Sequence, residues 1–277
     1  MFWVDMLRLN ARVFMKKELS FLCSQSLLLL AVGCTPSASD LETPQTPAVV
    51  IDQAGNVEDA VACIFRQRIE TIRGDVTAGT AFSAKLPQSD RKVIVTAIHL
   101  LGPAGGLSSQ VSAVEISNVV ETVSIFRIAG DEQEQSFPAM PYQLAGAAPF
   151  PESSTNGDVL VFAVPDGTAL DAIEFSTEAL QPVDPVWLAA HVIGGAPDGQ
   201  FLHQGRFLGI DDDGYFEMEF LNAQLDLRAT SGAPIVNNSG YVVAVNLAGM
   251  EVEGALCGYG NPVTRFVPGL DEAMPDE

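Results

Sequence analysis

From residue 76 onward, short apolar runs alternate with turn-forming residues. The runs are rich in Val, Ile and Phe, and many alternate apolar with polar positions, which is the period of a half-buried strand. The runs that predict strands are 76–86, 92–97, 111–116, 119–128, 158–164, 186–193, 201–210, 215–220, 233–236 and 241–248.

Turn and helix signals complete the pattern. Asp213-Gly214 and the Asn-Asn-Ser-Gly run at 237–240 predict turns between neighbouring strands. Helices are expected only at 56–68, with Asn56 near the N-cap, and at 263–274. With 24 Gly and 17 Pro, the pattern predicts an all-β fold, either barrels or a sandwich.

The charge is strongly acidic, with 14 Lys and Arg against 35 Asp and Glu and a formal net charge of −21. A phosphate backbone requires a basic footprint, so nucleic acid is excluded as a partner. Most of this charge is expected to lie on a solvated surface.

The N-terminus has the plan of an export signal. In residues 15–34 a basic start precedes a short apolar run and ends in small residues, which is too short for an ordinary membrane span. We take Met15 as the true start and 1–34 as the signal. The end, LAVGC at 30–34, resembles a bacterial lipobox, which implies cleavage before Cys34 and lipid on its thiol. A plain signal peptide with an incidental Cys34 is the alternative.

Residues 35–50 are rich in Pro, Ser and Thr and predict a flexible tether. The folded domain is then expected at 51–277. We expect an exported protein of the bacterial envelope that faces the periplasm or the exterior and is held to the membrane by lipid at Cys34. Cys63 and Cys257 remain for one disulfide, but sequence does not show that their Cα atoms approach closely enough.

Three segments carry candidate chemistry. The first contains GTAF at 79–82 and, one strand later, TAIH at 96–99. The second is GDVLVF at 157–162, and the third is ATSGAPIVN at 229–237, which is followed by another apolar run. Their order along the chain places His99 first, then Asp158, then Ser231.

Together these segments resemble the trypsin/chymotrypsin-like serine proteases, over about residues 60–268. The resemblance implies two six-stranded antiparallel β-barrels, at about 60–170 and 171–265, with a short C-terminal helix. It implies a peptide hydrolase acting on proteins or peptides without a cofactor or metal. The catalytic triad would be His99, Asp158 and Ser231, in a cleft between the barrels, with His99 as general base and Asp158 orienting its ring.

The motif around the serine departs from the family pattern. The Gly expected two residues before it is Ala229, whose N–H would form the oxyanion hole with that of Ser231. Gly permits φ > 0 where Ala resists it, so the hole is in question. Thr230 replaces the Asp of the trypsin branch, and Ala233 replaces a Gly.

The same resemblance indicates residues that contact substrate. The base of the primary pocket corresponds to Leu225, which predicts an apolar or small side chain in the substrate; a shift of one residue to Asp226 would predict a basic one. Asn246, Leu247 and Ala248 correspond to the strand that pairs with the substrate backbone.

Two other functions compete with the protease. A catalytically impaired pseudoprotease that acts as a binding or scaffolding lipoprotein is favoured by Ala229. An esterase of the α/β-hydrolase type requires the order Ser, Asp, His and a helix after the serine, and neither is present. The acidic run 211–213 lacks the spacing of a calcium loop and predicts a hairpin turn.

Overall fold

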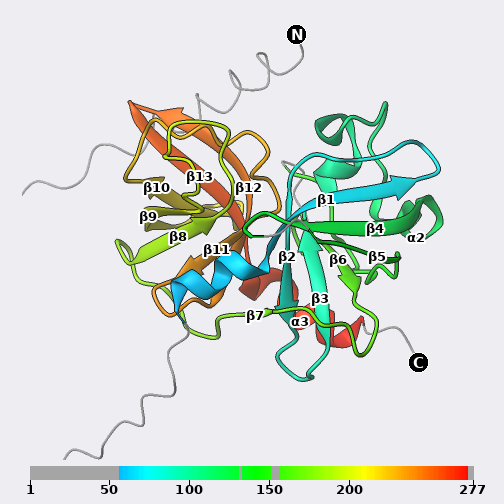
Figure 1. Ribbon diagram of the computed structural model, residues 1–277. Helices are drawn as coiled ribbons and strands as arrows, with labels where there is room; N and C mark the ends of the chain where they lie inside the picture. Colours follow the sequence, from blue (N-terminus) through cyan, green and yellow to red (C-terminus); the bar gives the residue numbers. More distant parts are fainter. Residues whose placement is uncertain (1–55, 131–132, 151–155, 274–277) are drawn as a thin grey trace, which may run out of the picture. The chain divides into compact units, whose positions relative to one another are not determined.

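The computed structural model describes residues 56–130, 133–150 and 156–273, all within one compact unit (Figure 1). The first sheet contains β1 (Ile64–Thr71), β2 (Thr80–Lys85), β3 (Lys92–Thr96), β4 (Val120–Arg127), β5 (Glu134–Pro138), β6 (Leu160–Ala163) and β7 (Ile173–Glu174). The second contains β8 (Pro185–Ala189), β9 (Leu202–Ile210), β10 (Phe216–Phe220), β11 (Pro234–Asn237), β12 (Val242–Val252) and β13 (Ala255–Pro262). The helical elements are η1 (Val57–Cys63), η2 (Ile98–Leu101), η3 (Pro103–Gly105), η4 (Ala113–Glu115), α2 (Ile116–Val119) and α3 (Val263–Glu272).

The first sheet has the strand order β5-β4-β1-β2-β3-β6, and β7 pairs in parallel with β2. Immediately after β5 the chain leaves β4 and runs beside β6. There Ala163 N–H donates to the Met140 carbonyl and Tyr142 N–H donates to the Val161 carbonyl, both at 2.9 Å. These bonds join the segment that follows β5 to β6, so they bring the two ends of the path together as in a barrel.

The second sheet is a closed barrel in the order β10-β13-β12-β11-β8-β9. Its strand pairs are antiparallel, and α3 follows the last strand directly. The all-β fold class is therefore confirmed, with a chymotrypsin-like arrangement and a short C-terminal helix. Of the two six-stranded barrels expected, only the second is closed, and the first sheet has seven strands because the short β7 is added to it. The hairpin turn predicted at Asp213-Gly214 joins β9 to β10, and the one predicted at 237–240 joins β11 to β12.

The helix predicted at 56–68 is half correct. Asn56 caps it, since its side chain accepts from Glu58 N–H at 3.2 Å, but the helix is 3₁₀ and ends at Cys63. From Ile64 the chain is β1, which pairs with β2 on one side and β4 on the other. The strand pairing of β1 with β2 and β4 stabilises an extended chain after Cys63 more than the helical spacing of its apolar residues stabilises a helix.

One strand prediction is wrong, and three further strands, β5, β7 and β13, were not predicted. Residues 111–116 form no strand; they contain η4 and the start of α2, and Ser112 and Glu115 make a capping box. The strand β13 was not predicted, because its Gly258, Gly260 and Pro262 are typical of turns. A Cβ at Gly258 would lie 2.9 Å from the Phe220 ring, so close packing against β10 explains this glycine inside a strand.

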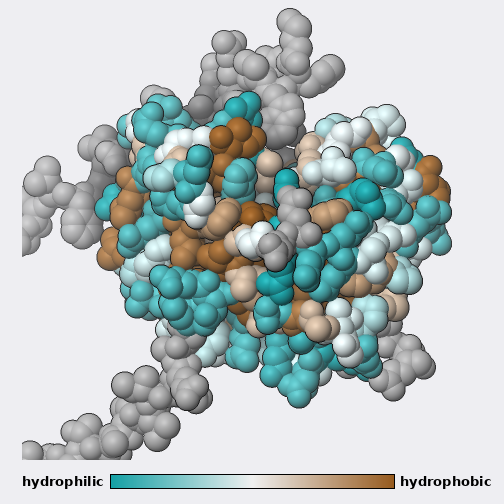
Figure 2. Space-filling model, viewed as in Figure 1, coloured by the Kyte–Doolittle hydropathy of each residue, from teal (hydrophilic) through white to brown (hydrophobic). Residues whose placement is uncertain are grey.

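Two clusters of buried apolar side chains form the core. The larger fills the first sheet and extends to α3, where Phe266 meets Phe175 edge to face. The smaller fills the second barrel. The face drawn in Figure 2 is mostly hydrophilic, and its apolar side chains lie in separate patches. No helix among the described residues has the length and apolarity needed to cross a membrane.

Cys63 and Cys257 are both free and buried, so the disulfide left open by the sequence does not form. Cys63 belongs to the core cluster of the first sheet, whereas Cys257 is on β13 of the second barrel. Burial raises the pKa of the Cys63 thiol to about 11. Burial also raises the pKa of Cys257, with Glu219 and Glu217 adding to the shift. The signal at 1–34, with Cys34, and the tether at 35–50 lie outside the described residues.

His203 is a buried polar residue of the second barrel, with 1% of its surface exposed. Its Nε2 lies 3.1 Å from the Ala190 carbonyl oxygen, which fixes Nε2 as the protonated nitrogen of the neutral ring. Its Nδ1 is buried and has no hydrogen-bond partner in the described part of the chain. Burial lowers the pKa of His203, and the charge of nearby His191 lowers it further, while the Ala190 bond opposes both.

We predict that His203 makes the fold less stable in mild acid. Above the unfolded histidine pKa of roughly 6.5 neither state binds the proton. As the pH falls below this value the unfolded chain binds it first, so the free energy of unfolding decreases. Thermal melts from pH 7.5 to pH 5.5 should show a smaller loss of Tm for His203→Gln than for the wild type. Ser109→Ala, at an exposed position, is the control and should keep the wild-type curve. Parallel curves for wild type and His203→Gln would contradict the prediction.

Candidate active site

His99 and Asp158 are brought together by the pairing of β3 with β6. The strands are antiparallel, and Thr96 at the end of β3 faces Leu160 at the start of β6. His99 lies in η2, just after β3, and Asp158 lies just before β6. The His99 Nδ1 atom is 2.5 Å from Asp158 Oδ2, and the His99 N–H donates to Oδ1 at 3.1 Å. The sheet register therefore sets the geometry of this pair.

Asp158 has no solvent exposure, and its carboxylate is held by three donors. The third is the Phe150 N–H, at 2.9 Å from Oδ2. An ionised carboxylate only accepts hydrogen bonds, so the His99 proton lies on Nδ1 and its Nε2 carries the lone pair. The ring is thus oriented with its basic nitrogen directed away from Asp158, and its side chain is 14% exposed.

Ser231 lies in the loop that precedes β11, and this loop packs against the end of β3. The Ser231 carbonyl accepts from the Thr80 N–H at 2.8 Å, and the Gly232 N–H donates to the Asn246 carbonyl at 2.7 Å. Gly232 has φ +87, and a Cβ there would lie 2.2 Å from the Thr80 carbonyl oxygen and 3.2 Å from the Ala97 nitrogen. The glycine after the serine is therefore required both by conformation and by space.

The Ser231 hydroxyl donates to the Leu247 carbonyl oxygen at 2.9 Å. Within the described residues no hydrogen bond joins it to the His99 ring. The three residues predicted as a triad are thus in one region, with the acid and base engaged and the serine hydroxyl bonded to β12.

The Ala229 backbone is in the left-handed region, with φ +67. For a residue with a Cβ this conformation costs about 1–2 kcal/mol. The Ala229 carbonyl accepts from the Thr80 hydroxyl at 3.0 Å. In the part of the chain that the structure describes, neither the Ala229 N–H nor the Ser231 N–H donates to a protein acceptor. The two donors expected for an oxyanion hole are therefore both unoccupied, although Ala stands in place of Gly.

Comparison with known proteins agrees with this geometry. Residues 77–245, more than half of the chain, match the family model described as a trypsin-like peptidase domain. The chain belongs to the trypsin-like peptidase family. No curated protein matches it in sequence.

Similar solved structures include the active form of the Rv3671c protease from M. tuberculosis, with 18% identity, a TM-score of 0.48, and coverage of 91% of this chain and 96% of that one. The HtrA-type protease AlgW with a tripeptide is 13% identical, with a TM-score of 0.47 and coverage of 76% and 60%. The serine endoprotease from Yersinia pestis is 16% identical, with a TM-score of 0.47 and coverage of 76% and 63%. The chain thus spans less than two thirds of the last two structures.

The substrate-pocket prediction involves two leucines of the loop before Ser231. Leu225 is 7% exposed and belongs to the core cluster of the second barrel, so its role as the base of the primary pocket stays a prediction. Leu227 is partly buried against the same cluster and also approaches β12, because a Cβ at Gly249 would lie 2.3 Å from Leu227 Cδ1.

Asp226 is engaged by Arg228. The Arg228 Nε donates to Asp226 Oδ1 at 2.8 Å and to Oδ2 at 3.0 Å, and the Arg228 N–H donates to Oδ1 at 3.2 Å. The hydrogen bonds from the Arg228 side chain and then from its backbone lower the pKa of Asp226 to about 2. Asp226 is therefore ionised, but its charge is already matched by a cation of the same loop.

The edge of β12 beyond Val245 is where an extended peptide could pair. β11 pairs with β12 only as far as Val245, and the pairing of β12 with β13 shifts register between Asn246 and Ala248. The Asn246 backbone is bonded to Gly232 and Ala233, and the Leu247 carbonyl accepts from the Ser231 hydroxyl. Of the three residues predicted to contact substrate, Leu247 and Ala248 lie beyond the end of the β11–β12 pairing, and Ala248 pairs with Tyr259 on the β13 side.

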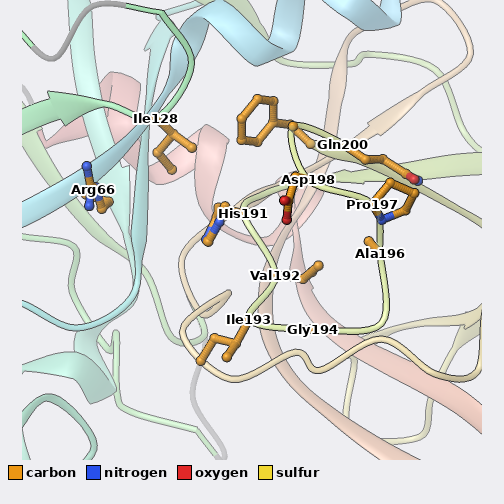
Figure 3. A pocket seen from close by; sticks show the side chains of 12 residues that line it. Arg66, Ile128, His191, Val192, Ile193, Gly194, Ala196, Pro197, Asp198 and Gln200 are labelled. Atoms are coloured by element: carbon orange, nitrogen blue, oxygen red, sulfur yellow. The ribbon is translucent and has the colours of Figure 1, made fainter.

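A separate cavity of about 370 Å³ lies between Arg66 and Ile128 on one side and the loop 191–201 on the other (Figure 3). None of His99, Asp158 and Ser231 lines it. The described residues contain no group of three or more His, Cys, Asp or Glu side chains that could hold a metal ion.

Sequence reasoning missed three contributors to the site. The Phe150 N–H and the Thr80 backbone act through groups that every residue carries, so no sequence signal marks them. The Thr80 hydroxyl is different, because a hydroxyl at the start of a buried strand is a polar group that needs a partner. That signal was present in the GTAF segment.

Proposed function

We propose that the chain is a serine endopeptidase in which His99, Asp158 and Ser231 form the catalytic triad. The observation that carries the proposal is the buried Asp158 carboxylate bonded to His99 Nδ1. A buried charge is retained only where it is well paired, and this pairing gives His99 a basic Nε2 beside the Ser231 loop. The membership of the trypsin-like peptidase family supports the same reaction and a protein or peptide substrate.

The reaction begins when the Ser231 hydroxyl turns from the Leu247 carbonyl toward His99. His99 Nε2 removes the hydroxyl proton while Oγ attacks the peptide carbonyl carbon. The carbonyl oxygen becomes an oxyanion that the Ala229 and Ser231 N–H groups stabilise. His99 then gives its proton to the leaving amine, which leaves an acyl group on Ser231. In the second half His99 takes a proton from water as the water attacks the acyl carbon, and it then returns the proton to Ser231 Oγ. Asp158 stabilises the imidazolium that forms in each half.

A binding or scaffolding role is the second candidate. The observation in its favour is the Ser231 hydroxyl bonded to Leu247 instead of His99. The reactivity of Ser231 Oγ distinguishes the two functions, because only an activated hydroxyl reacts with an electrophilic probe.

If the proposed triad is catalytic, a fluorophosphonate probe should label Ser231 covalently. Ser231→Ala and His99→Ala should abolish labelling and lower kcat/KM for a cleaved peptide by roughly 10⁴–10⁶-fold, since the triad acts as a unit. Exposed Ser109→Ala and His191→Ala are the matched controls and should label like the wild type. Absence of labelling in folded wild-type protein would favour the binding role.

The side chain that precedes the cleaved bond should be small and apolar. Leu227 lies over Gly249, where the primary pocket is expected, and the negative charge of Asp226 is already paired with the Arg228 side chain. Neither feature suits Lys or Arg in the substrate.

Leu227→Ala should enlarge this pocket. In a peptide library we expect kcat/KM for substrates with Leu or Phe at this position to rise about tenfold relative to Ala, since each added methylene is worth roughly 1–3 kcal/mol in a fitted apolar pocket. Leu221→Ala, at a position 66% exposed, is the control and should not change the profile. A preference for Lys or Arg in the wild type would show that Leu227 does not limit the pocket.

We also propose that the protein acts in the bacterial envelope, held by lipid at Cys34. The basis is the sequence of residues 15–34, and envelope proteins or peptides are then its substrates. Cys34→Ser should move the protein from the membrane fraction to the soluble fraction, and mass spectrometry of the wild type should find an acylated N-terminal cysteine after cleavage. Wild-type protein that fractionates as soluble would leave only the plain export signal.

A further inference from the structure

The conformation of Ala229 requires a group that holds it. Ala resists the left-handed region that Gly enters freely, and at φ +67 it is one of three non-glycine residues with positive φ among the described residues, with Val183 and Glu253. Ala229 is also exposed, so close packing around its side chain does not impose the conformation.

Thr80 supplies the only hydrogen bond to the Ala229 carbonyl within the described chain. Its hydroxyl donates to that oxygen at 3.0 Å, and its N–H donates to the Ser231 carbonyl at 2.8 Å. One residue at the start of β2 thus binds both residues whose N–H groups are free for an oxyanion. Each of these bonds crosses from the first sheet to the loop of the second barrel.

Thr80 is itself fixed by buried hydrogen bonds. It is 2% exposed, and its carbonyl accepts from the Thr96 hydroxyl at 2.9 Å. The Thr96 oxygen in turn accepts from Gln67 Nε2 at 2.9 Å, and the same Nε2 donates to the Ala78 carbonyl at 3.1 Å. Because Gln67, Thr80 and Thr96 lie on three adjacent strands, the Thr80 hydroxyl has a rigid support.

The other polar contacts of the loop act on neighbouring residues. The Thr230 hydroxyl donates to the Leu227 carbonyl at 2.6 Å, and Asn246 Nδ2 donates to the Thr230 oxygens at 3.0 and 3.1 Å. The Thr230 N–H also donates to the Leu227 carbonyl at 3.2 Å and closes a turn whose third residue is Ala229, but the Ala229 carbonyl itself is left to Thr80.

We propose that Thr80 is a positioning residue of the oxyanion hole: its hydroxyl holds Ala229 in the left-handed turn and so keeps the Ala229 and Ser231 N–H groups available to the developing oxyanion. The catalytic part of this inference rests on the proposed serine peptidase function. It explains how the hole is formed in a chain with Ala at the position of the usual Gly, without an Asp beside the serine.

The test compares Thr80→Val, which removes the hydroxyl at nearly constant shape, with Thr80→Ser, which keeps it. We expect Thr80→Val to lower kcat by about 10- to 100-fold with little change in KM, because the loss of one oxyanion donor lowers rate by about 10²–10³ and displacement of the turn is a partial loss. Thr80→Ser should restore most of the rate. An unchanged kcat in Thr80→Val, or an equal loss in Thr80→Ser, would overturn the proposal.

A second background separates positioning from general damage to the fold. In Ala229→Gly the left-handed turn needs no support, so adding Thr80→Val there should lower kcat by a clearly smaller factor than it does in the wild type. Equal factors in the two backgrounds would mean that Thr80 acts elsewhere. Should Thr80→Val not fold, as judged by circular dichroism, Thr80→Ala takes its place in both comparisons.

A crystal structure of the Thr80→Val protein gives a readout that does not depend on activity. Ala229 should leave positive φ in that variant and keep it in Thr80→Ser. Ala229 at positive φ in Thr80→Val would overturn the inference even in an active enzyme. If wild-type Ser231 is not labelled by the fluorophosphonate, the peptidase function fails, and the two crystal structures still decide whether Thr80 holds the turn.

Discussion

The hydrogen bond from the Thr80 N–H to the Ser231 carbonyl joins the first sheet to the loop that carries Ser231, the proposed nucleophile. Thr80 is the first residue of β2, β2 pairs with β3, and His99 follows β3. The bond therefore fixes the position of Ser231 relative to His99 through two neighbouring strands. The contact is close enough that only Gly fits at 232, where a Cβ would lie 2.2 Å from the Thr80 carbonyl. The relative placement of Asp158, His99 and Ser231 is therefore set by main-chain geometry rather than by flexible side chains.

Full burial of the Asp158 charge is tolerable because two of its three donors are backbone N–H groups. An unpaired carboxylate in this position would destabilise the fold by several kcal/mol. Hydrogen bonds, and not a permanently charged side chain, hold the Asp158 carboxylate. When the His99 ring takes up a proton, its positive charge can therefore pair directly with this carboxylate. The same three donors thus stabilise the native fold, and the carboxylate lies where it could also stabilise a charged imidazole in the proposed reaction.

The sequence predicted the fold class, most strands of both sheets and the two turns, because those depend on apolar alternation and local turn chemistry. It failed at β1, β5, β7 and β13 and at residues 111–116. Strand pairing and close packing distant in the chain decide β1 and β13, whereas at 111–116 the local capping box of Ser112 and Glu115 outweighs the apolar pattern. Motifs were sufficient to identify His99, Asp158 and Ser231 as residues that could meet. They did not show that both Leu225 and Leu227 pack on the core of the second barrel or that Leu227 approaches Gly249, since these contacts depend on the path of a loop with no periodic pattern.

The two unpaired cysteines bear on the conditions in which the fold persists. Thiolate is the form that oxidises, and burial keeps Cys63, with its pKa of about 11, almost wholly as the thiol. Cys257 is shielded in the same way and is flanked by carboxylates that oppose a further negative charge. Neither sulfur contributes a cross-link, so both cores rest on apolar packing and strand pairing alone. The described fold is therefore indifferent to redox potential: it requires no oxidant to mature and loses no covalent bond in a reducing medium.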